Sequence, residues 1–225
     1  MSKRETWFVL GKKREKISRF IIENSETCIL VEKFEYGFVL EPQISPSFEV
    51  VGIPEGWRFS GQVTPGEVLF NILDRKEERC AFVESCTGGL CCTRLTEMPG
   101  SSRILWGGWV VYANEAKVLL GVPQEVLQNF GAVSKQTVLE LARAGRMQSG
   151  ADWCVSISGI AGPEGGSPEK PIGTVWIGIN GKEGNKRAVQ FRFAGGRAGI
   201  REKASAAAFL LLYRFVQGKK KKSAC

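Results

Sequence analysis

The sequence predicts an α/β protein of the three-layer α/β/α type with a mixed sheet, preceded by a small, mostly β appendage. From about residue 64 onward, apolar β-type runs alternate with segments of helical periodicity, the order expected when helices cover both faces of a sheet. The runs at 174–179 and 188–193 read as an antiparallel pair, which makes the sheet mixed. Residues 1–62 hold only short β-type runs between turn residues.

Residues 1–62 form a region apart. We expect strands there at 6–10, 27–31, 37–40 and 48–51, separated by Asn, Ser, Pro and Gly. No catalytic pattern occurs among them, so the region is given no function. The chain is therefore divided into this appendage, a main domain over 63–218 and a basic tail over 219–225.

The main domain opens with a capping box. Thr64 is the expected N-cap, Pro65 the first helical residue and Glu67 the partner of the cap. The elements expected after this helix, which runs to about Arg75, are a strand at 79–83, a helix from about Gly88, a break at 99–102, a strand at 109–112, helices at 114–120, from Pro123 and from Ser134, a strand at 153–158, the strand pair named above and a helix at 197–217.

The composition is typical of a reduced, cytoplasmic globular protein. A chain of 225 residues with 43% hydrophobic content can bury a core. Its seven cysteines form an odd set without C-x-x-C spacing, which indicates neither a disulfide framework nor a zinc site. The longest apolar run, residues 204–213, is too short to cross a membrane, so no membrane partner is expected.

The formal net charge of +8 lies at the ends of the chain. Residues 1–20 carry a net charge of +5, and Lys219 to Lys222 add four more positive charges, so the body is close to neutral. A nucleic-acid-binding protein that acts through its basic ends is one hypothesis. The near-neutral body argues against it, and no nucleic-acid partner is expected.

The sequence contains no histidine. This excludes Ser-His and Cys-His nucleophile pairs as well as imidazole metal sites. No metal ion or other cofactor is expected, and an activated nucleophile must use a lysine, a tyrosine or a carboxylate as its base.

The candidate nucleophile lies on the turn after the apolar run 81–84. Ser85, Cys86 and Thr87 precede two glycines, so the run reads as a strand that enters a tight turn and then a helix. The first N–H groups of a helix and its macrodipole favour an anion, and a hydroxyl or thiol here would lie beside such donors. The alternative is an ordinary turn in which Ser or Thr caps the helix.

Three loops are expected at the carboxyl ends of strands, where ligands bind in α/β sheets. They are the Ser85 turn, the segment after Tyr112 and the loop 159–166, which has four glycines. Without histidine, Lys117 is the candidate base for Ser85. Its pKa must fall from about 10.4 to near 7, which requires burial, so Lys117 is expected to be buried. The alternative is a solvated helix lysine.

The glycine loop has three interpretations: a tight turn, a phosphate cradle or a flexible lid. It lacks the form of an ATP or GTP phosphate loop, because Lys170 follows too late. Arg197 opens the last helix, and its planar guanidinium suits a phosphate or a carboxylate. The alternative for Arg197 is a surface position, which is what we expect for Arg201 and Lys203.

Several long motifs of the main domain occur in the order of a known family. They are ESCTGG at 84–89, GWVVYANEAK at 108–117, GAVS at 131–134, VSISGIAGP at 155–163 and GTVW at 173–176. Over about residues 64–217 the sequence resembles the CinA C-terminal domain family, which includes nicotinamide-nucleotide amidohydrolase, also called nicotinamide mononucleotide deamidase. The resemblance does not cover residues 1–62.

The resemblance implies a serine-lysine amidohydrolase that converts nicotinamide mononucleotide to nicotinate mononucleotide and ammonia without a metal, in pyridine nucleotide recycling. Ser85 matches the nucleophile, Lys117 the general base and Tyr112 an assisting hydroxyl. Arg197 matches the arginine of the F-x-G-D-R segment, where Gly196 replaces the usual Asp. The expected substrate-binding residues are Thr87, Gly88, Gly89, Asn114, Gly159 and Arg197. Family members commonly form dimers, so a homodimer is an expected assembly.

Two further alternatives stay open. Cys86 could act as the nucleophile, since thiolates attack well, although the family pattern favours Ser85. The chain could also be a catalytically weak nucleotide-binding or regulatory module that keeps the fold, because fold alone does not establish activity.

Overall fold

The computed structural model describes residues 7–10, 28–34, 37–42 and 64–217. The chain divides into two compact units, residues 1–64 and 65–225. The expected strand at 48–51 and the basic tail at 219–225 lie outside the described residues. No described helix combines the length and the apolar character needed to cross a membrane.

The first unit contains a three-stranded antiparallel sheet. Its strands are β1 (Trp7–Leu10), β2 (Cys28–Phe34) and β3 (Gly37–Pro42), in the order β1-β3-β2. In the register of the ladders, Phe8 pairs with Val39 and Leu30 pairs with Leu40. Three of the four strands expected in this region are therefore confirmed.

The second unit is built on a mixed five-stranded sheet with the order β5-β4-β6-β7-β8. Parallel pairing joins β4 to β5 and to β6, whereas β7 is antiparallel to β6 and β8. The strands are β4 (Cys80–Glu84), β5 (Leu105–Val110), β6 (Trp153–Gly159), β7 (Thr174–Gly181) and β8 (Lys186–Arg192). This confirms the predicted mixed sheet.

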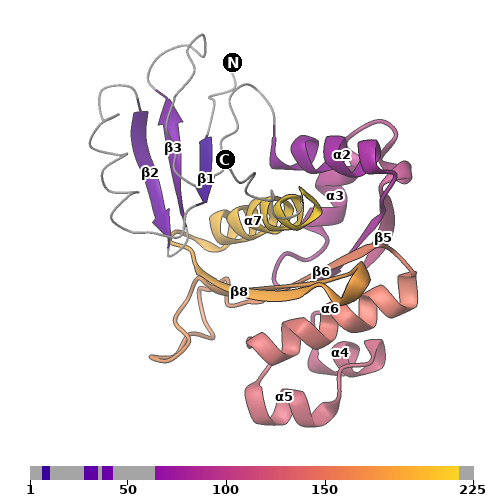
Figure 1. The fold of residues 1–225 in the computed structure, drawn as a ribbon. Helices are drawn as coiled ribbons and strands as arrows, with labels where there is room; N and C mark the ends of the chain where they lie inside the picture. Colours follow the sequence, from indigo (N-terminus) through magenta and orange to yellow (C-terminus); the bar gives the residue numbers. More distant parts are fainter. Residues whose placement is uncertain (1–6, 11–27, 35–36, 43–63, 218–225) are drawn as a thin grey trace, which may run out of the picture. The chain divides into compact units, whose positions relative to one another are not determined.

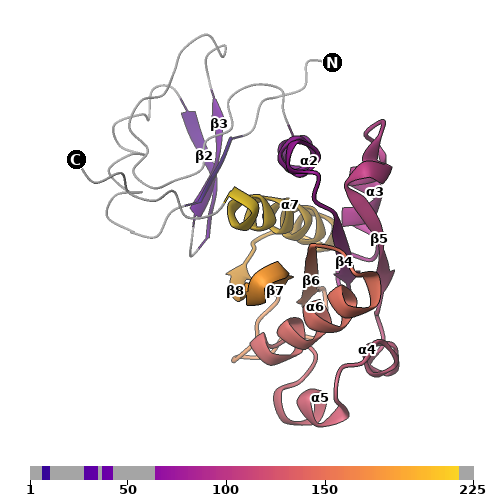
Figure 2. The ribbon, with the colours of Figure 1, turned by 45° about the vertical axis from the view of Figure 1, so that its right-hand side comes forward.

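Helices cover both faces of this sheet, as Figures 1 and 2 show. One face carries α2, α3 and α7, and the other carries α4, α5 and α6. Their bounds are α2 (Pro65–Lys76), α3 (Leu90–Thr96), α4 (Asn114–Leu120), α5 (Gln124–Phe130), α6 (Lys135–Ser149) and α7 (Arg197–Gln217). The three layers form because helices on both faces bury apolar side chains against the sheet, as Phe209 of α7 and Leu141 of α6 do.

The core lies on both faces of the interior strand β4, whose five residues are all buried. Phe82 contacts Phe209 of α7 edge to face on one side of the sheet. Ala81 and Val83 belong to an apolar cluster with Leu141 of α6 on the other side. Both faces of β4 are apolar because it lies between two parallel neighbours and under two helical layers.

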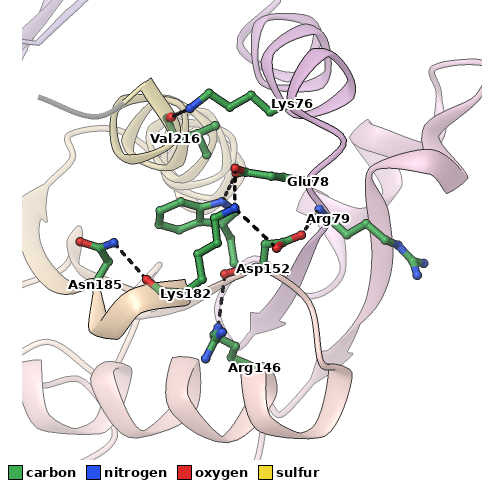
Figure 3. Close-up of polar contacts among 9 residues, drawn as sticks. Lys76, Glu78, Arg79, Arg146, Asp152, Lys182, Asn185 and Val216 are labelled. Atoms are coloured by element: carbon green, nitrogen blue, oxygen red, sulfur yellow. Dashed lines mark hydrogen bonds and ion pairs between the residues drawn. The ribbon is translucent and has the colours of Figure 1, made fainter. Parts of the chain in front are cut away.

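A network of hydrogen bonds and ion pairs lies at the end of the sheet where β4 and β6 begin (Figure 3). The Glu78 carboxylate accepts hydrogen bonds from the Trp153 indole and pairs with the Lys182 ammonium at 2.8 Å. Asp152 accepts from the backbone N–H of Arg79 at 2.8 Å, and its carbonyl accepts from Arg146. These contacts tie the starts of two strands to the β7–β8 connection.

Two predicted boundaries were wrong. The helix expected from Gly88 begins at Leu90, because Gly88 and Gly89 both have positive φ and cannot belong to a right-handed helix. The strand expected at 109–112 is Leu105–Val110. It lies earlier because Val110 pairs with Glu84, the last residue of β4, so the ladder ends there.

Candidate active site at the carboxyl edge of the sheet

Four connecting segments leave the sheet at one edge. Glu84, the end of β4, pairs with Val110 of β5 and with Ile157 of β6. The antiparallel ladders bring the end of β8 to the same edge, since Thr174 pairs with Arg192 and Val175 with Gly159. The segments 85–89, 111–113, 160–173 and 193–196 therefore start side by side, which confirms that the three predicted loops meet.

The Ser85 turn leaves one reachable backbone donor. The Gly88 N–H donates to the Ser85 carbonyl at 3.1 Å, and the Leu90 N–H donates to the Thr87 carbonyl at 3.3 Å. Within the part of the chain that the structure describes, the N–H groups of Cys86, Thr87 and Gly89 donate to no other residue, and Cys86 is buried. Thr87 is fully buried and Gly89 is half-buried. The Gly89 N–H is thus the donor that a ligand can reach.

Two hydroxyls of the turn also have no partner among the described residues. The Thr87 Oγ1 is buried and makes no hydrogen bond. Ser85 is 7% exposed, and its Oγ makes no hydrogen bond to a described residue. Native proteins pair nearly all buried polar groups with a hydrogen-bond partner, so several unpaired polar groups within residues 85–89 are unusual.

Glu84 holds the helix that follows this turn. Its side chain is 1% exposed, and its two carboxylate oxygens accept from the backbone N–H groups of Cys91 and Cys92 at 3.2 and 3.0 Å. Glu84 therefore satisfies two of the orphan donors at the start of α3 and complements the helix dipole. Sequence reasoning missed this role, although a carboxylate just before a glycine turn and a helix start was a usable signal.

Lys117 is buried, as predicted. Its residue is 1% exposed on α4. Its Nζ donates to the carbonyls of Val111 and Tyr112, both at 2.9 Å, and of Ala113 at 3.4 Å. Burial lowers the pKa of Lys117, while the nearby Cys86 and Glu115 oppose that shift. Three carbonyl acceptors match the three protons of an ammonium group, so this contact set suits the cation.

Lys117 and Ser85 lie at the same edge but are not hydrogen-bonded to each other. All three contacts of the Lys117 Nζ go to the segment after β5. For Lys117 to accept the Ser85 proton, it must first lose a proton and release one carbonyl, because a neutral amine has only two N–H groups and one lone pair.

Tyr112, Arg197 and the glycine loop are connected directly. Arg197 donates to the Tyr112 hydroxyl at 2.9 Å and to the Gly162 carbonyl at 2.9 Å. Tyr112 is 59% exposed, so its contact with Arg197 lies at the solvent-exposed rim of the candidate site. Because the Tyr112 oxygen accepts from Arg197, its own proton remains available to a ligand.

The prediction that Arg201 is only a surface residue was wrong. Arg201 lies one turn after Arg197 on α7, and its Nη2 donates to the Thr87 carbonyl at 2.7 Å. A Cβ on Gly88 would lie 3.4 Å from the same nitrogen. The four-residue spacing from Arg197 was a usable signal, since residues four apart share a helix face. Lys203 donates to the Ala194 carbonyl at 2.9 Å.

The remaining predicted residues also lie at this edge. Asn114, the first residue of α4, is exposed. A Cβ on Gly159 would lie 2.6 Å from Cγ2 of Val175 and 2.9 Å from the Thr174 carbonyl, so close packing against β7 requires glycine there. Gly196 has open space where a Cβ would be, and Arg197 makes its two contacts without an Asp before it.

Cys86 is a poor nucleophile in this setting. It is 5% exposed, and burial raises the pKa of its thiol to about 12. Nearby Arg197 and Arg201 oppose that rise only in part. At neutral pH the thiol therefore stays protonated, and a thiol is far less reactive than a thiolate. Among the described residues, no group of three or more acidic or cysteine side chains could hold a metal ion.

Comparison with known proteins identifies the family. The model of the CinA C-terminal domain matches residues 64–216. The chain belongs to this family. A CinA-like protein of Leptospira biflexa is 48% identical over 140 residues, which are 62% of this chain and 34% of that protein. The chain spans about a third of the length of such curated relatives.

Solved structures of the family share the fold of the second unit. The competence/damage inducible protein CihA of Agrobacterium tumefaciens is 36% identical with a TM-score of 0.65, covering 70% of this chain and 99% of that one. The competence damage-inducible protein A of Klebsiella pneumoniae is 30% identical with a TM-score of 0.66, covering 70% of this chain and 100% of that one.

Proposed function

We propose that the chain is an amidohydrolase that converts nicotinamide mononucleotide to nicotinate mononucleotide and ammonia, with Ser85 as nucleophile and Lys117 as general base. The observation that carries this proposal is Lys117. Lys117, a residue that is 1% exposed, lies at the same strand edge as the Ser85 hydroxyl, which has no hydrogen-bond partner among the described residues. A buried lysine can lose its proton near neutral pH, which an exposed lysine does not do.

Acylation follows from these residues. Lys117, once neutral, accepts the Ser85 proton while the Ser85 oxygen attacks the carboxamide carbon. The Gly89 N–H, which has no acceptor among the described residues, donates to the oxygen that becomes negative. Loss of one such donor typically costs about 100-fold to 1,000-fold in rate.

The second half of the reaction returns the proton. The ammonium of Lys117 gives up one proton, which the Tyr112 hydroxyl, whose oxygen accepts from Arg197, relays to the departing amino group, so ammonia leaves and Lys117 is neutral again. A water then gives a proton to Lys117 as its oxygen attacks the nicotinoyl ester, and Lys117 returns that proton to the Ser85 oxygen as the ester bond breaks. Arg197, at the exposed rim, is suited to the nucleotide phosphate because its guanidinium can bind two oxygens at once.

The test is ammonia release from a set of amides that differ in one group each. Nicotinamide mononucleotide, nicotinamide riboside and nicotinamide are assayed with the wild type and with Ser85→Ala. We expect release from the mononucleotide, a much slower reaction with the riboside because it lacks the phosphate, and no release with Ser85→Ala. Equal rates with and without Ser85 would exclude the mechanism.

A second function is favoured by one observation. The Lys117 ammonium donates to three carbonyls and is not hydrogen-bonded to Ser85, which suits a catalytically weak nucleotide-binding or regulatory module. Isothermal titration with nicotinamide mononucleotide separates the two. Binding without ammonia release between pH 6 and pH 10 would favour the module, whereas release that increases with pH supports the amidohydrolase.

A further inference from the structure

Two glycines give the Ser85 turn access to more than one backbone conformation. Gly88 and Gly89 are adjacent and have φ of +60° and +91°. Because glycine has no Cβ, the peptide between them can rotate at little cost. Such a rotation would replace the Gly89 N–H, the reachable donor, by the Gly88 carbonyl, which repels a developing negative charge.

Two charged side chains fix the neighbouring peptides. Glu84 accepts from the backbone N–H groups of Cys91 and Cys92. The Arg201 guanidinium donates to the Thr87 carbonyl at 2.7 Å. The same carbonyl accepts from the Leu90 N–H at 3.3 Å, so it connects the two ends of the glycine pair. Arg201 therefore helps to fix the orientation of the Thr87 carbonyl, to which the Leu90 N–H also donates.

We propose that Arg201 is a positioning residue, which keeps the Gly89 N–H directed at the reacting oxygen by holding the Thr87 carbonyl. This rests on the proposed amidohydrolase function for its kinetic consequence but not for its structural one. Arg201 differs from Arg197 in what it contacts: Arg197 contacts the Tyr112 hydroxyl and the Gly162 carbonyl at the rim. Because the two arginines contact different groups, we expect loss of Arg201 to lower kcat and loss of Arg197 to raise KM.

The kinetic experiment compares Arg201→Ala, Arg201→Lys and Arg197→Ala in the full chain, with Arg187→Ala as a control that removes an exposed positive charge from β8. For Arg201→Ala we expect kcat to fall about 10-fold to 100-fold, the scale of a misplacement near the reacting atoms, with little change in KM. Arg201→Lys should recover part of kcat. Arg197→Ala should mainly raise KM, and Arg187→Ala should change neither.

A second measurement does not depend on activity. The amide resonances of Gly88 and Gly89 in ¹⁵N-labelled protein report the conformation of the turn. We expect both to shift or broaden in Arg201→Ala, to move toward the wild type in Arg201→Lys, and to stay unchanged in Arg187→Ala. Unchanged glycine amides in a folded Arg201→Ala protein would overturn the inference, as would a rise in KM without loss of kcat.

The two measurements separate this inference from the proposed function. If the wild type releases no ammonia from any of the amides but the glycine amides move in Arg201→Ala, the amidohydrolase fails while the positioning role stands. If the wild type is active and Arg201→Ala keeps both its kcat and its glycine amides, the positioning role fails alone. Should Arg201→Ala not fold, the same comparisons are made with Arg201→Lys.

Discussion

The two ends of the five-stranded sheet differ in how completely their polar side chains are paired. At the end where β4 and β6 begin, Glu78 and Asp152 have protein partners for their carboxylates (Figure 3). At the end where the same strands finish, the hydroxyls of Ser85 and Thr87 have none among the described residues. An unpaired buried polar group costs about 1 to 3 kcal/mol. Pairing at the start of β4 and β6 stabilises the fold, whereas the unpaired hydroxyls at the end of these strands reduce stability at the candidate site.

The largest expected effect contrasts a lysine from each end. Lys117→Met removes the proposed base and fills much of its space, so ammonia release should fall by about 100-fold to 10,000-fold, the usual contribution of a general base. Lys182→Met removes an ammonium that is paired with Glu78 at 2.8 Å at the other end, and activity should stay at the wild-type level. Steady-state assays of both variants check this. Equal losses would mean that the two ends do not differ in function.

A smaller effect is expected from the two buried carboxylates. In Glu84→Gln one oxygen can still accept from the start of α3, but the new amide group faces the other N–H, so the turn is strained. Activity should fall about 10-fold or more, as expected for a displaced oxyanion donor. In Glu78→Gln activity should persist, while the free energy of unfolding falls by about 1 to 3 kcal/mol, the value of a charge-assisted hydrogen bond.

Urea unfolding and ammonia assays of the same preparations separate these outcomes. Glu78→Gln is the matched control for Glu84→Gln, because both residues are buried glutamates, one just before β4 and the other at its end. Loss of activity in Glu78→Gln at a temperature where it is fully folded would contradict the division between the two ends.

Local sequence signals predicted the elements of the second unit well. Ser134 was expected to cap a helix, and its hydroxyl accepts from the Thr137 N–H at the start of α6. Gly121 was expected to end the helix 114–120, and it has the left-handed conformation of a helix end. These features depend on residues within one turn of each other, so a short stretch of sequence determines them.

Contacts between distant segments could not be predicted in the same way. The contact of Arg201 with the Thr87 carbonyl joins residues 114 positions apart, and it exists only after α7 has packed beside the Ser85 turn. The three carbonyls around Lys117 depend on how the chain bends after Val110. The burial of Lys117 was predicted from the requirement of its chemistry, whereas its hydrogen-bond partners were not.

The pH dependence of kcat tests the state of Lys117 at the candidate site. The base must be neutral, so kcat should rise tenfold per pH unit below the pKa of Lys117 and level off above it. Burial lowers that pKa, with Cys86 and Glu115 acting against the shift, so the midpoint should lie below the ordinary lysine value of about 10.4. A profile that is flat from pH 6 to pH 10 would contradict this assignment, and Lys182→Met should leave the midpoint unchanged.

The smallest effect is expected at Cys86, the neighbour of Ser85. Burial raises the pKa of its thiol to about 12, so iodoacetamide at pH 7 should label it only after denaturation, because the thiolate is the reactive form. Cys86→Ala should therefore keep most of the ammonia-releasing activity while Ser85→Ala loses it. Mass spectrometry of the alkylated folded protein checks the labelling. Rapid labelling of Cys86 with parallel loss of activity would instead make the thiol the nucleophile, and Ser85 would then be a hydroxyl of the turn that only contributes to its shape.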